Sequence, residues 1–453
     1  MKSIAGFFGR SRRTVVALAA VMSIGLVAGH GAGVVSAQRP HAGCSGGSLT
    51  VYTDSVRKPA VDAYVTAHPD VCVTVVVWSG DGNGATEGQT DIEKWNTAGT
   101  GWANVMFSEQ VNDPIWMAQA PFNYAASLKG AISAKVLKNW SKTSLAQCTV
   151  AGKLICLQDN LAPEVLWVNT HLMKKFQYKV PHTWQQWAAI GKDVAKHHKG
   201  YIVGTLGDSY GGWLYYWANQ CHLESLQSNG DLMINGKDKN CTEMTNLLAP
   251  LVADGTVVHS SVFDSDFPKT WGKTDKVLML PGATWYALSI LQSTCEIPSG
   301  QMTAADPLAW GNNKTVTTGQ VGGGPWIISR HDSGSRLALD ASFVVWETTQ
   351  FNPLPLSNPN ARPGLPADSA IAKSWLASLN KQKYFSAPPG PAIQKAVGEV
   401  WRGWSIVTYS DQSYWSTNVK GGLAQGNSLG SYFANYVNDL AKAAQAAGYN
   451  VKR

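Results

Sequence analysis

The segment 207–211 contains Gly-Asp-Ser-Tyr-Gly, which has the residue types and spacing of a nucleophile elbow. A Gly-x-Ser-x-Gly turn between a strand and a helix exposes its serine hydroxyl for attack on an ester. An apolar run precedes this turn and a helix-like segment follows it. Asp264 or Asp266, with His331, would complete a triad with Ser209 in the chain order of such hydrolases. No His-Gly-Gly loop for an oxyanion hole stands upstream, so a secreted serine esterase is the alternative and not the main interpretation.

The glycine-rich segment 78–84 (WSGDGNG) follows an apolar run and is a second candidate site. Backbone N–H groups of such a loop can cradle an oxyanion such as phosphate. Asp81 would place a negative charge in that cradle, so a flexible turn is the preferred interpretation. Tyr215 and Tyr216 are adjacent on a predicted helix and cannot face one ferric ion together. The histidines show no metal-ligand spacing, and the sequence predicts neither a metal nor a cofactor.

Tryptophan and tyrosine are abundant, with 19 and 15 copies. Flat aromatic faces can bind the C–H faces of a sugar ring, while planar polar side chains bind its hydroxyl groups. Most of these rings must still serve the core, because an aromatic residue usually stabilises a fold by burying area. The informative rings are those at loop ends and helix starts.

The elements that position these residues alternate between strands and helices. Val165–Val168 is a short run of strand-forming residues, and Thr183 with Gln186 forms a capping box at the start of a helix. Apolar residues then recur at helical spacing. Val71–Trp78 is a nearly continuous apolar run, typical of a strand covered on both faces in a parallel sheet. This alternation predicts an α/β layer architecture.

Three segments resemble, in the expected order, the extracellular solute-binding proteins of family 1, the sugar-type receptors of bacterial ABC importers. The segment 164–198 has an apolar strand that ends in Asn, a short Lys-rich helix, and Pro-x-Thr-Trp at the start of a long helix. Lys276–Ile290 (KVLMLPGATWYALSI) resembles the family's strand, small residues and Trp-bearing helix start. Gly322–Trp346 resembles its Gly-rich strand followed by a helix. The resemblance extends over most of residues 48–450.

The resemblance implies a type II periplasmic-binding-protein-like fold with two lobes. Each lobe would be a mostly parallel sheet flanked by helices, and hinge crossings would join the lobes. The expected first lobe comprises residues 38–160 plus 280–330. The expected second lobe comprises residues 161–279 plus 331–453.

The resemblance also implies which residues contact the ligand. Trp285 matches the Trp at a helix start that stacks on sugar, and the segment 207–213 matches a loop in which the second lobe offers an aromatic residue. Open α/β sheets also bind ligands at the carboxyl ends of their strands. A predicted helix after Pro391 would add one more ring. The expected ligand-contacting residues are Trp285, Tyr210, Trp78, Ser79, Asp81, Glu109, Trp213 and Trp401.

Residues 1–37 have the features of a signal peptide. Four basic residues precede the apolar run Val15–Val27, which is too short for a membrane span of about 20 residues. Val35-Ser36-Ala37 supplies small residues for cleavage. Ser11–Val15 resembles a twin-arginine signal, so this route and ordinary secretion both fit. The chain carries a net charge of +7, of which this segment contributes +4, and the remaining +3 is too little to imply a nucleic-acid partner.

All seven cysteines lie beyond the expected cleavage site, which suits an oxidising compartment. Cys148 and Cys156 face each other across a predicted hairpin and are the first expected disulfide. Cys221 and Cys241 enclose a polar loop and are the next expected pair, although sequence alone does not fix connectivity.

Three cysteines are left over, so one thiol must stay unpaired or be modified. They are Cys44, Cys72 and Cys295. Cys44 could carry a lipid at the mature N-terminus, which would anchor the protein to a membrane. His41 stands where a lipoprotein signal has an aliphatic residue, which argues against lipidation.

The sequence therefore predicts a monomeric, exported, extracytoplasmic receptor that closes around a small-molecule solute, an oligosaccharide or a polyol. The receptor would pass the solute to the permease subunits of an ABC transporter, without a cofactor or a chemical step. The esterase alternative predicts ester hydrolysis that is lost on Ser209→Ala. A ligand-free surface or scaffolding protein of the same fold is a third class, and it would show no ligand-induced stabilisation.

Overall fold

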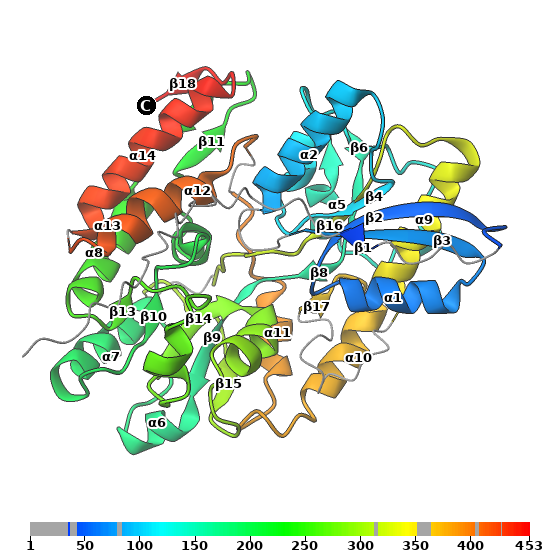
Figure 1. The fold of residues 1–453 in the computed structure, drawn as a ribbon. Coiled ribbons are helices and arrows are strands. Elements are labelled where there is room, and N and C mark those ends of the chain that lie inside the picture. The colour runs from blue at the N-terminus through cyan, green and yellow to red at the C-terminus, as the bar shows by residue number, and fades with distance from the viewer. Residues whose placement is uncertain are drawn as a thin grey trace, which may run out of the picture.

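The computed structural model describes residues 35–36, 43–78, 84–311, 316–350, 364–403, 407–426 and 428–453. Two hydrophobic cores divide these residues into two lobes, which lie side by side in Figure 1. The first lobe contains residues 43–158 and 325–350, and the second contains residues 161–321 and 365–453. The two-lobed α/β architecture predicted from the sequence is confirmed.

The first lobe is built on one sheet covered by helices. Its strands are β1 (Val35–Ser36), β2 (Gly47–Asp54), β3 (Val71–Trp78), β4 (Val105–Phe107), β7 (Cys156–Gln158) and β16 (Pro325–Ile328), with a hairpin of β5 (Thr149–Val150) and β6 (Lys153–Leu154). Its helices are α1 (Lys58–Ala67), α2 (Gly84–Ala98), α3 (Asp113–Met117), α4 (Ala134–Leu137), α5 (Lys142–Gln147) and α9 (Gly334–Thr349). The strand order is β1-β3-β2-β4-β16-β7. The ladders of β2 with β3 and β4 are parallel, whereas those of β1 with β3 and of β16 with β4 and β7 are antiparallel, so the sheet is mixed and not mostly parallel as expected. α1 and α9 pack on one side of this sheet, and α2 lies on the other side in Figure 1.

The second lobe combines several small sheets with many helices. Its strands are β9 (Glu164–Asn169), β10 (Gly204–Thr205), β11 (Glu224–Leu226), β12 (Leu232–Ile234), β13 (Val257–Val258), β14 (Met279–Ala283), β15 (Met302–Ala305) and β18 (Val451–Lys452). Its α-helices are α6 (Thr170–Lys175), α7 (Trp184–His197), α8 (Lys239–Ala253), α10 (Ser369–Leu379), α11 (Gly390–Ala396), α12 (Asp411–Trp415), α13 (Gly421–Leu423) and α14 (Leu429–Ala446). It also has a 3₁₀-helix, η3 (Thr284–Ala287), and the π-helical turns η1 (Gly212–Tyr216), η2 (Pro268–Gly272), η4 (Ser289–Thr294) and η5 (Ser416–Lys420).

β9 is the central strand of the second lobe, and all of its residues are buried. It pairs antiparallel with both β14 and β15, whereas β10 and β13 pair in parallel. The mostly parallel sheet expected here is therefore replaced by an antiparallel one around β9. A strand buried on both faces is apolar throughout whichever way its neighbours run, so the sequence pattern could not indicate their direction.

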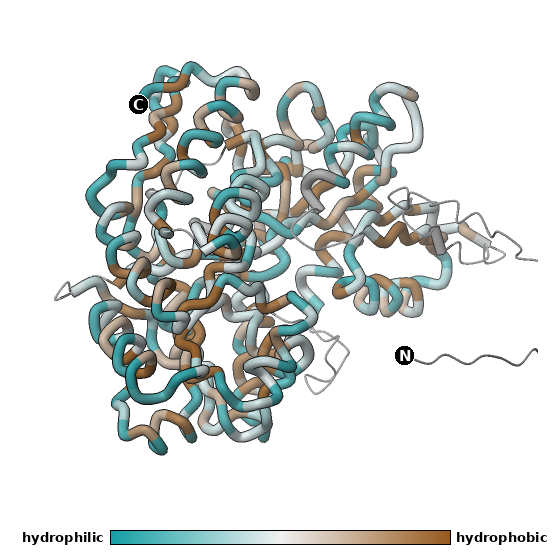
Figure 2. The backbone as a smooth tube through the Cα atoms, turned by 60° about the vertical axis from the view of Figure 1, so that its left-hand side comes forward, coloured by the Kyte–Doolittle hydropathy of each residue, from teal (hydrophilic) through white to brown (hydrophobic). Residues whose placement is uncertain are grey.

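Side-chain caps begin α6 and α7 where the sequence predicts them. Asn169 Oδ1 accepts a hydrogen bond from Leu172 N at 3.0 Å, and Thr183 Oγ1 accepts one from Gln186 N at 3.1 Å. Gln186 Oε1 in turn accepts from His182 N at 2.8 Å, so the capping box reaches one residue further back than usual. Figure 2 shows hydrophobic segments mainly inside each lobe and hydrophilic ones mainly on outer turns.

The chain crosses between the lobes three times, and the crossings bond to one another. On the first crossing, β8 (Asn160–Leu161) pairs antiparallel with β17 (Leu365–Pro366) on the third. The second crossing, 318–325, donates from Val321 N to Ala162 O at 3.1 Å. Gly323 on this crossing has a φ of 87°, a left-handed conformation that glycine adopts without strain.

The lobe boundaries differ from those expected from the sequence, which places 280–330 in the first lobe and 331–453 in the second. The structure keeps β14 in the second lobe, and the chain returns to the first lobe only at 318–325. α9 then packs Phe343 and Val344 into the first core. The Pro281-Gly282 pair resembles a turn, but β14 is an edge strand, where a missing proline N–H is tolerated.

Three disulfides join six of the cysteines, and two of them are the expected pairs. Cys148–Cys156 closes the β5–β6 hairpin with a Cα–Cα distance of 5.0 Å, and Cys221–Cys241 has a distance of 4.6 Å. The third disulfide is Cys44–Cys72. The remaining cysteine, Cys295, is buried and has no disulfide partner among the described residues.

The predicted signal peptide lies outside the described residues, apart from Val35–Ser36, which form β1 and pair antiparallel with β3. Within the described ranges, no helix has both the length and the apolar character needed to cross a bilayer.

Candidate ligand-binding site

A cleft of about 550 Å³ lies between the two lobes, next to the second crossing. Residues that follow β2 and β4 line its first-lobe wall, and Gly322 and Gly323 line its floor. The loops after β10, β13 and β14, together with α12 and η5, line its second-lobe wall. The cleft therefore lies at the ends of strands from both lobes, where α/β sheets commonly bind ligands.

Three aromatic rings meet on the second-lobe wall. Tyr210 precedes η1, Phe263 lies in the loop after β13, and Trp285 lies in η3. The Phe263 and Trp285 rings are nearly parallel, at 22° with centroids 6.3 Å apart, and Tyr210 stands almost perpendicular to both. Phe263 is 48% exposed, an unusual amount for a large hydrophobic side chain in this chain. The wall thus presents apolar ring surface to the cleft.

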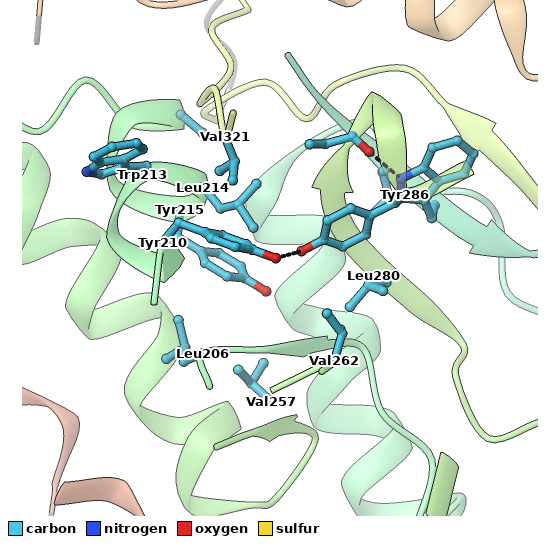
Figure 3. Packing of buried hydrophobic residues seen from close by; sticks show 14 of the residues in the cluster. Leu206, Tyr210, Trp213, Leu214, Tyr215, Val257, Val262, Leu280, Tyr286 and Val321 are labelled. Carbon is cyan, nitrogen blue, oxygen red and sulfur yellow. Dashed lines mark hydrogen bonds between the residues drawn. The ribbon is translucent and has the colours of Figure 1, made fainter. Parts of the chain in front are cut away.

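A buried hydrogen-bond network supports these rings from below. The hydroxyl groups of Tyr210 and Tyr286 lie 3.2 Å apart, as the dashed line in Figure 3 shows. Tyr286 donates to Asp208 Oδ2 at 3.3 Å, and Ser261 Oγ donates to Asp208 Oδ1 at 2.5 Å. Burial raises the pKa of Asp208 to about 6, although these donors and Lys420 oppose the rise. A negative charge above pH 6 would therefore hold both tyrosines in place.

Arg57 is the basic residue of the first-lobe wall, and carboxylates already surround it. Its Nη1 donates to Asp54 Oδ2 at 2.9 Å, its Nε lies 3.8 Å from Asp159 Oδ2, and its guanidinium stacks 4.1 Å above Phe107. Burial opposes the positive charge, but the carboxylates of Asp54, Asp159 and Glu109 outweigh it and raise the pKa of Arg57. The cleft therefore holds a fixed guanidinium whose charge is compensated.

Four side chains of the cleft have a buried polar atom with no hydrogen-bond partner among the described residues: Arg57 Nε, Gln110 Oε1, Asn160 Oδ1 and Gln412 Nε2. The three amide residues are 8%, 3% and 4% exposed, respectively. A buried polar group left unpaired costs about 1–3 kcal/mol. The residues that carry these groups line the cleft, so a molecule that enters it lies beside them.

The structure brings three of the expected contact residues to the cleft, namely Tyr210, Glu109 and Trp285. It leaves three others away from the described cleft lining. Trp78 stacks on Tyr52, Trp213 is buried and donates to Asp411, and Trp401 packs its ring against His222. α11 ends at Ala396, so Trp401 is not on the expected helix. Ser79 and Asp81 lie outside the described residues.

Sequence reasoning missed Arg57, Phe263 and Gln412. Arg57 follows the carboxyl end of β2, so the strand-end rule applied to β3 and β4 would have found it. Phe263 stands in a polar loop without a pattern that marks it as exposed. Gln412 reaches the cleft only because α12 packs against the rest of the second lobe, which no local signal indicates.

The serine triad of the esterase alternative is not assembled around Ser209, although Ser209 does line the cleft. Asp264 pairs with Lys420 at 2.8 Å. Asp266 is exposed. His331 lies in the first lobe, stacked on Trp102 with centroids 3.6 Å apart, and it does not belong to the described cleft lining.

One group of side chains in the described residues has the proximity of a metal site, and it consists of Cys221, Asp238 and Cys241. The two sulfur atoms are bonded to each other in a disulfide. A disulfide sulfur is not a thiolate, which is the form that binds metals, so this group offers a single carboxylate.

Known proteins resemble this chain in both sequence and fold. Residues 46–333 match the model of the family described as bacterial extracellular solute-binding protein. A binding protein from B. animalis subsp. lactis Bl-04, solved with beta-1,6-galactobiose, is 15% identical with a TM-score of 0.71, over 90% of this chain and 99% of that one. The galacto-N-biose-/lacto-N-biose I-binding protein of Bifidobacterium longum is 14% identical with a TM-score of 0.71, over 89% and 98%.

The GacH receptor of Streptomyces glaucescens GLA.O, solved without ligand and with acarbose, is 16% identical with a TM-score of 0.64, over 89% and 99% of the two chains. No curated protein matches the sequence. At these identities the solved structures establish the two-lobed fold, while the family model covers well over half of the chain. The fold, the interlobe cleft and this match agree, and the chain belongs to the bacterial extracellular solute-binding protein family.

Proposed function

We propose that this chain is the extracytoplasmic receptor of an ABC importer and that it binds a carbohydrate, an oligosaccharide or a related polyol, in the interlobe cleft. The three neighbours named above are a galactobiose-binding protein, a lacto-N-biose-binding protein and an acarbose receptor. They support the assignment by fold, and the chemistry of this chain's own cleft supports it independently.

The polar side chains that line the cleft carry this proposal. Arg57 Nε can only donate a hydrogen bond, whereas the amides of Gln110, Asn160 and Gln412 both donate and accept. A hydroxyl group also does both, whereas a phosphate or carboxylate mainly accepts. A ligand rich in hydroxyl groups therefore satisfies this mixed set better than an anion does. The adjacent aromatic wall would cover the C–H face of a sugar ring.

Closure of the two lobes follows from the division of these groups. Arg57, Gln110 and Asn160 belong to the first-lobe side, whereas Gln412, Phe263 and Trp285 belong to the second. A ligand that contacts both sides binds the closed state more tightly than the open one, and so shifts the population toward closure. Tyr210 and Trp285 would stack on the ligand, and Glu109 would accept from its hydroxyl groups.

The surroundings of Ser209 support binding of the ligand without its chemical turnover. Ser209 would need a general base within hydrogen-bonding reach to become a nucleophile. His331 instead stacks on Trp102 in the other lobe. Hydrolysis of a generic ester by the purified protein, abolished by Ser209→Ala, would contradict this part of the proposal.

The Cys44–Cys72 disulfide indicates how the protein is held outside the cell. A lipid anchor at Cys44 would require its sulfur atom, which the structure joins to Cys72. We therefore infer an exported receptor without a lipid on Cys44. Mass spectrometry of the protein purified from its native membrane and medium fractions would detect the lipid if it were present.

The test of the receptor function is a ligand titration of the purified mature protein. Tryptophan fluorescence and melting temperature are followed against monosaccharides, oligosaccharides, polyols, phosphate and ferric citrate. A saturable rise in melting temperature is expected with one class of sugar or polyol, because a ligand of the folded state stabilises it by mass action. Saturable binding of phosphate or ferric citrate, with no response to any sugar or polyol, would contradict the proposal.

A further inference from the structure

A second, much smaller cavity lies inside the second lobe, between η1 and α12. Its volume of about 20 Å³ is enough for one water molecule or one small ion. Two carboxylates, Glu224 and Asp411, line it together with aromatic side chains. The principal rings are those of Trp213, Tyr216, Trp415, Phe433 and Tyr436.

Asp411 is held in place but is only partly paired. It is 5% exposed, and its Oδ2 accepts a hydrogen bond from Trp213 Nε1 at 2.5 Å. Its Oδ1 makes no hydrogen bond of ordinary geometry with any described residue, although the N–H groups of Asp411 and Gln412 lie near enough to favour its charged form. Glu224 accepts a hydrogen bond from Tyr409. The orphaned oxygen belongs to a residue that lines the cavity.

The cavity brings two carboxyl groups together without a basic side chain of the described residues beside them. No lysine, arginine or histidine of the described chain belongs to its lining. Burial raises the pKa of both carboxyl groups, and the charge of Asp411 raises the pKa of Glu224 further. Two carboxylates around one small space favour a positive charge between them, which can be a proton or a cation.

The aromatic lining favours a cation with weak hydration. Tyr216 and Phe433 stack with their centroids 4.6 Å apart, and Trp415 stands edge-on to Tyr436 at 5.3 Å. Aromatic faces attract cations, and the attraction is larger where water is excluded. Calcium would need six to eight oxygen ligands and magnesium an octahedral shell that usually keeps its waters. The described lining offers two carboxylates in a space of one water's size, which leaves no room for the waters that magnesium keeps.

We propose that this cavity binds one small monovalent cation, K⁺ or NH₄⁺, between Glu224 and Asp411. The cation would fix α12 against η1. Both elements border the ligand cleft, since Gln412 follows Asp411 and η1 begins two residues after Tyr210. The site is separate from the sugar cleft, and its test uses no sugar, so it can fail or succeed independently of the proposed function.

The first experiment measures the melting temperature of the full chain in KCl, NH₄Cl or tetraethylammonium chloride at constant total ionic strength. Tetraethylammonium is too large for the cavity and serves as the filler salt. A saturable rise of about 2 °C or more is expected with K⁺ or NH₄⁺ at pH 8. The rise should shrink at pH 5, because protons then compete for the carboxylates. Identical melting temperatures in all three salts would overturn the proposal.

The variants Glu224→Gln and Asp411→Asn separate a bound cation from a shared proton. Each should abolish the cation-dependent rise, whereas Asp254→Asn, which changes an exposed carboxylate of the same lobe, should keep it. A pH-dependent melting temperature that both variants flatten, with no cation dependence in the parent, would show a shared proton and refute the cation site.

A crystal of the parent protein gives a direct answer even if the variants do not fold. Thallium(I) substitutes for K⁺ and scatters anomalously. Crystals grown in thallium(I) acetate should show one anomalous peak between the Glu224 and Asp411 carboxylates. A well-ordered cavity without such a peak would refute the proposal.

Discussion

At the residue scale, the two parallel rings of the cleft wall are held differently. Trp285 donates its indole N–H to Val321 O at 2.8 Å, so its orientation is tied to the second crossing. Phe263 is half exposed and contacts the cleft through its ring. A substitution of Trp285 would therefore disturb both the site and the second crossing, whereas a substitution of Phe263 tests ring stacking alone.

We expect Phe263→Ala to weaken binding of the carbohydrate ligand by roughly 10- to 100-fold, that is about 1–3 kcal/mol, by analogy with the stacking of nucleic-acid bases on aromatic side chains. Isothermal titration of the ligand found in the panel would measure this. The matched control is Leu226→Ala, because Leu226 is 47% exposed in the same lobe but does not line the cleft. Equal affinities of the two variants would mean that Phe263 does not stack on the ligand.

At the element scale, α9 packs against the first lobe and carries a buried acidic residue, Asp340, among its buried side chains. Asp340 is fully buried, and neither of its carboxylate oxygens makes a hydrogen bond of ordinary geometry with a described residue, although the Asp332 carboxyl group lies near it. Burial, with the nearby charge of Asp332 as a second cause, raises the pKa of Asp340 from 3.8 to about 8. The helix therefore packs with this carboxyl group protonated at neutral pH.

This raised pKa predicts a pH-dependent cost of folding. Below pH 3.8 both the folded and the unfolded chain hold the proton, and ionisation of Asp340 costs no stability. Between that pH and about 8 only the folded state keeps the proton, so stability falls as the pH rises.

Asp340→Asn should remove this cost, because the amide has the shape of the protonated acid but does not ionise. We expect a gain of about 1–2 kcal/mol near pH 8 and none near pH 3.5, measured by urea unfolding at each pH. Asp70→Asn, which alters an exposed carboxylate in the same lobe, is the control. A gain in stability of the same size at both pH values would show that ionisation of Asp340 is not the cause of the gain.

At the scale of the whole molecule, the second crossing packs closely against the first at Gly323. A Cβ atom on Gly323 would lie 2.9 Å from Gln320 Nε2 and 3.1 Å from Asn160 O, and Asn160 belongs to the first crossing. The backbone of Gly323 is also left-handed, with a φ of 87°. A side chain here would therefore strain the crossing locally and press the two crossings apart.

We expect Gly323→Ala to shift the balance between open and closed lobes, seen as a changed radius of gyration in small-angle scattering with and without ligand. The matched control is Gly230→Ala, because Gly230 has the same φ of 87° but open space around its Cβ position. Both variants should lose about 1 kcal/mol of stability from the left-handed backbone. If both gave the parent's scattering curves, Gly323 would have no part in the lobe orientation.

Local patterns determined much of the fold. Thr183 and Gln186 define the start of α7 by sequence alone, because a cap depends on residues only three apart. The 3.6-residue period places Trp184 and Trp187 on its buried face. The motif order, more than any single motif, indicated the family, and the match over residues 46–333 confirms it.

Tertiary structure decided the lobe boundaries and the second wall of the site. Pro281-Gly282 could be a turn or an edge strand, and only its pairing with β9 shows which. Phe263 and Gln412 reach the cleft through packing between segments more than a hundred residues apart, and no local pattern records such contacts. The sequence therefore determined which elements form, since their signals lie within a few residues. Only the packed chain decided which side chains meet across the cleft, because that depends on distant elements coming together.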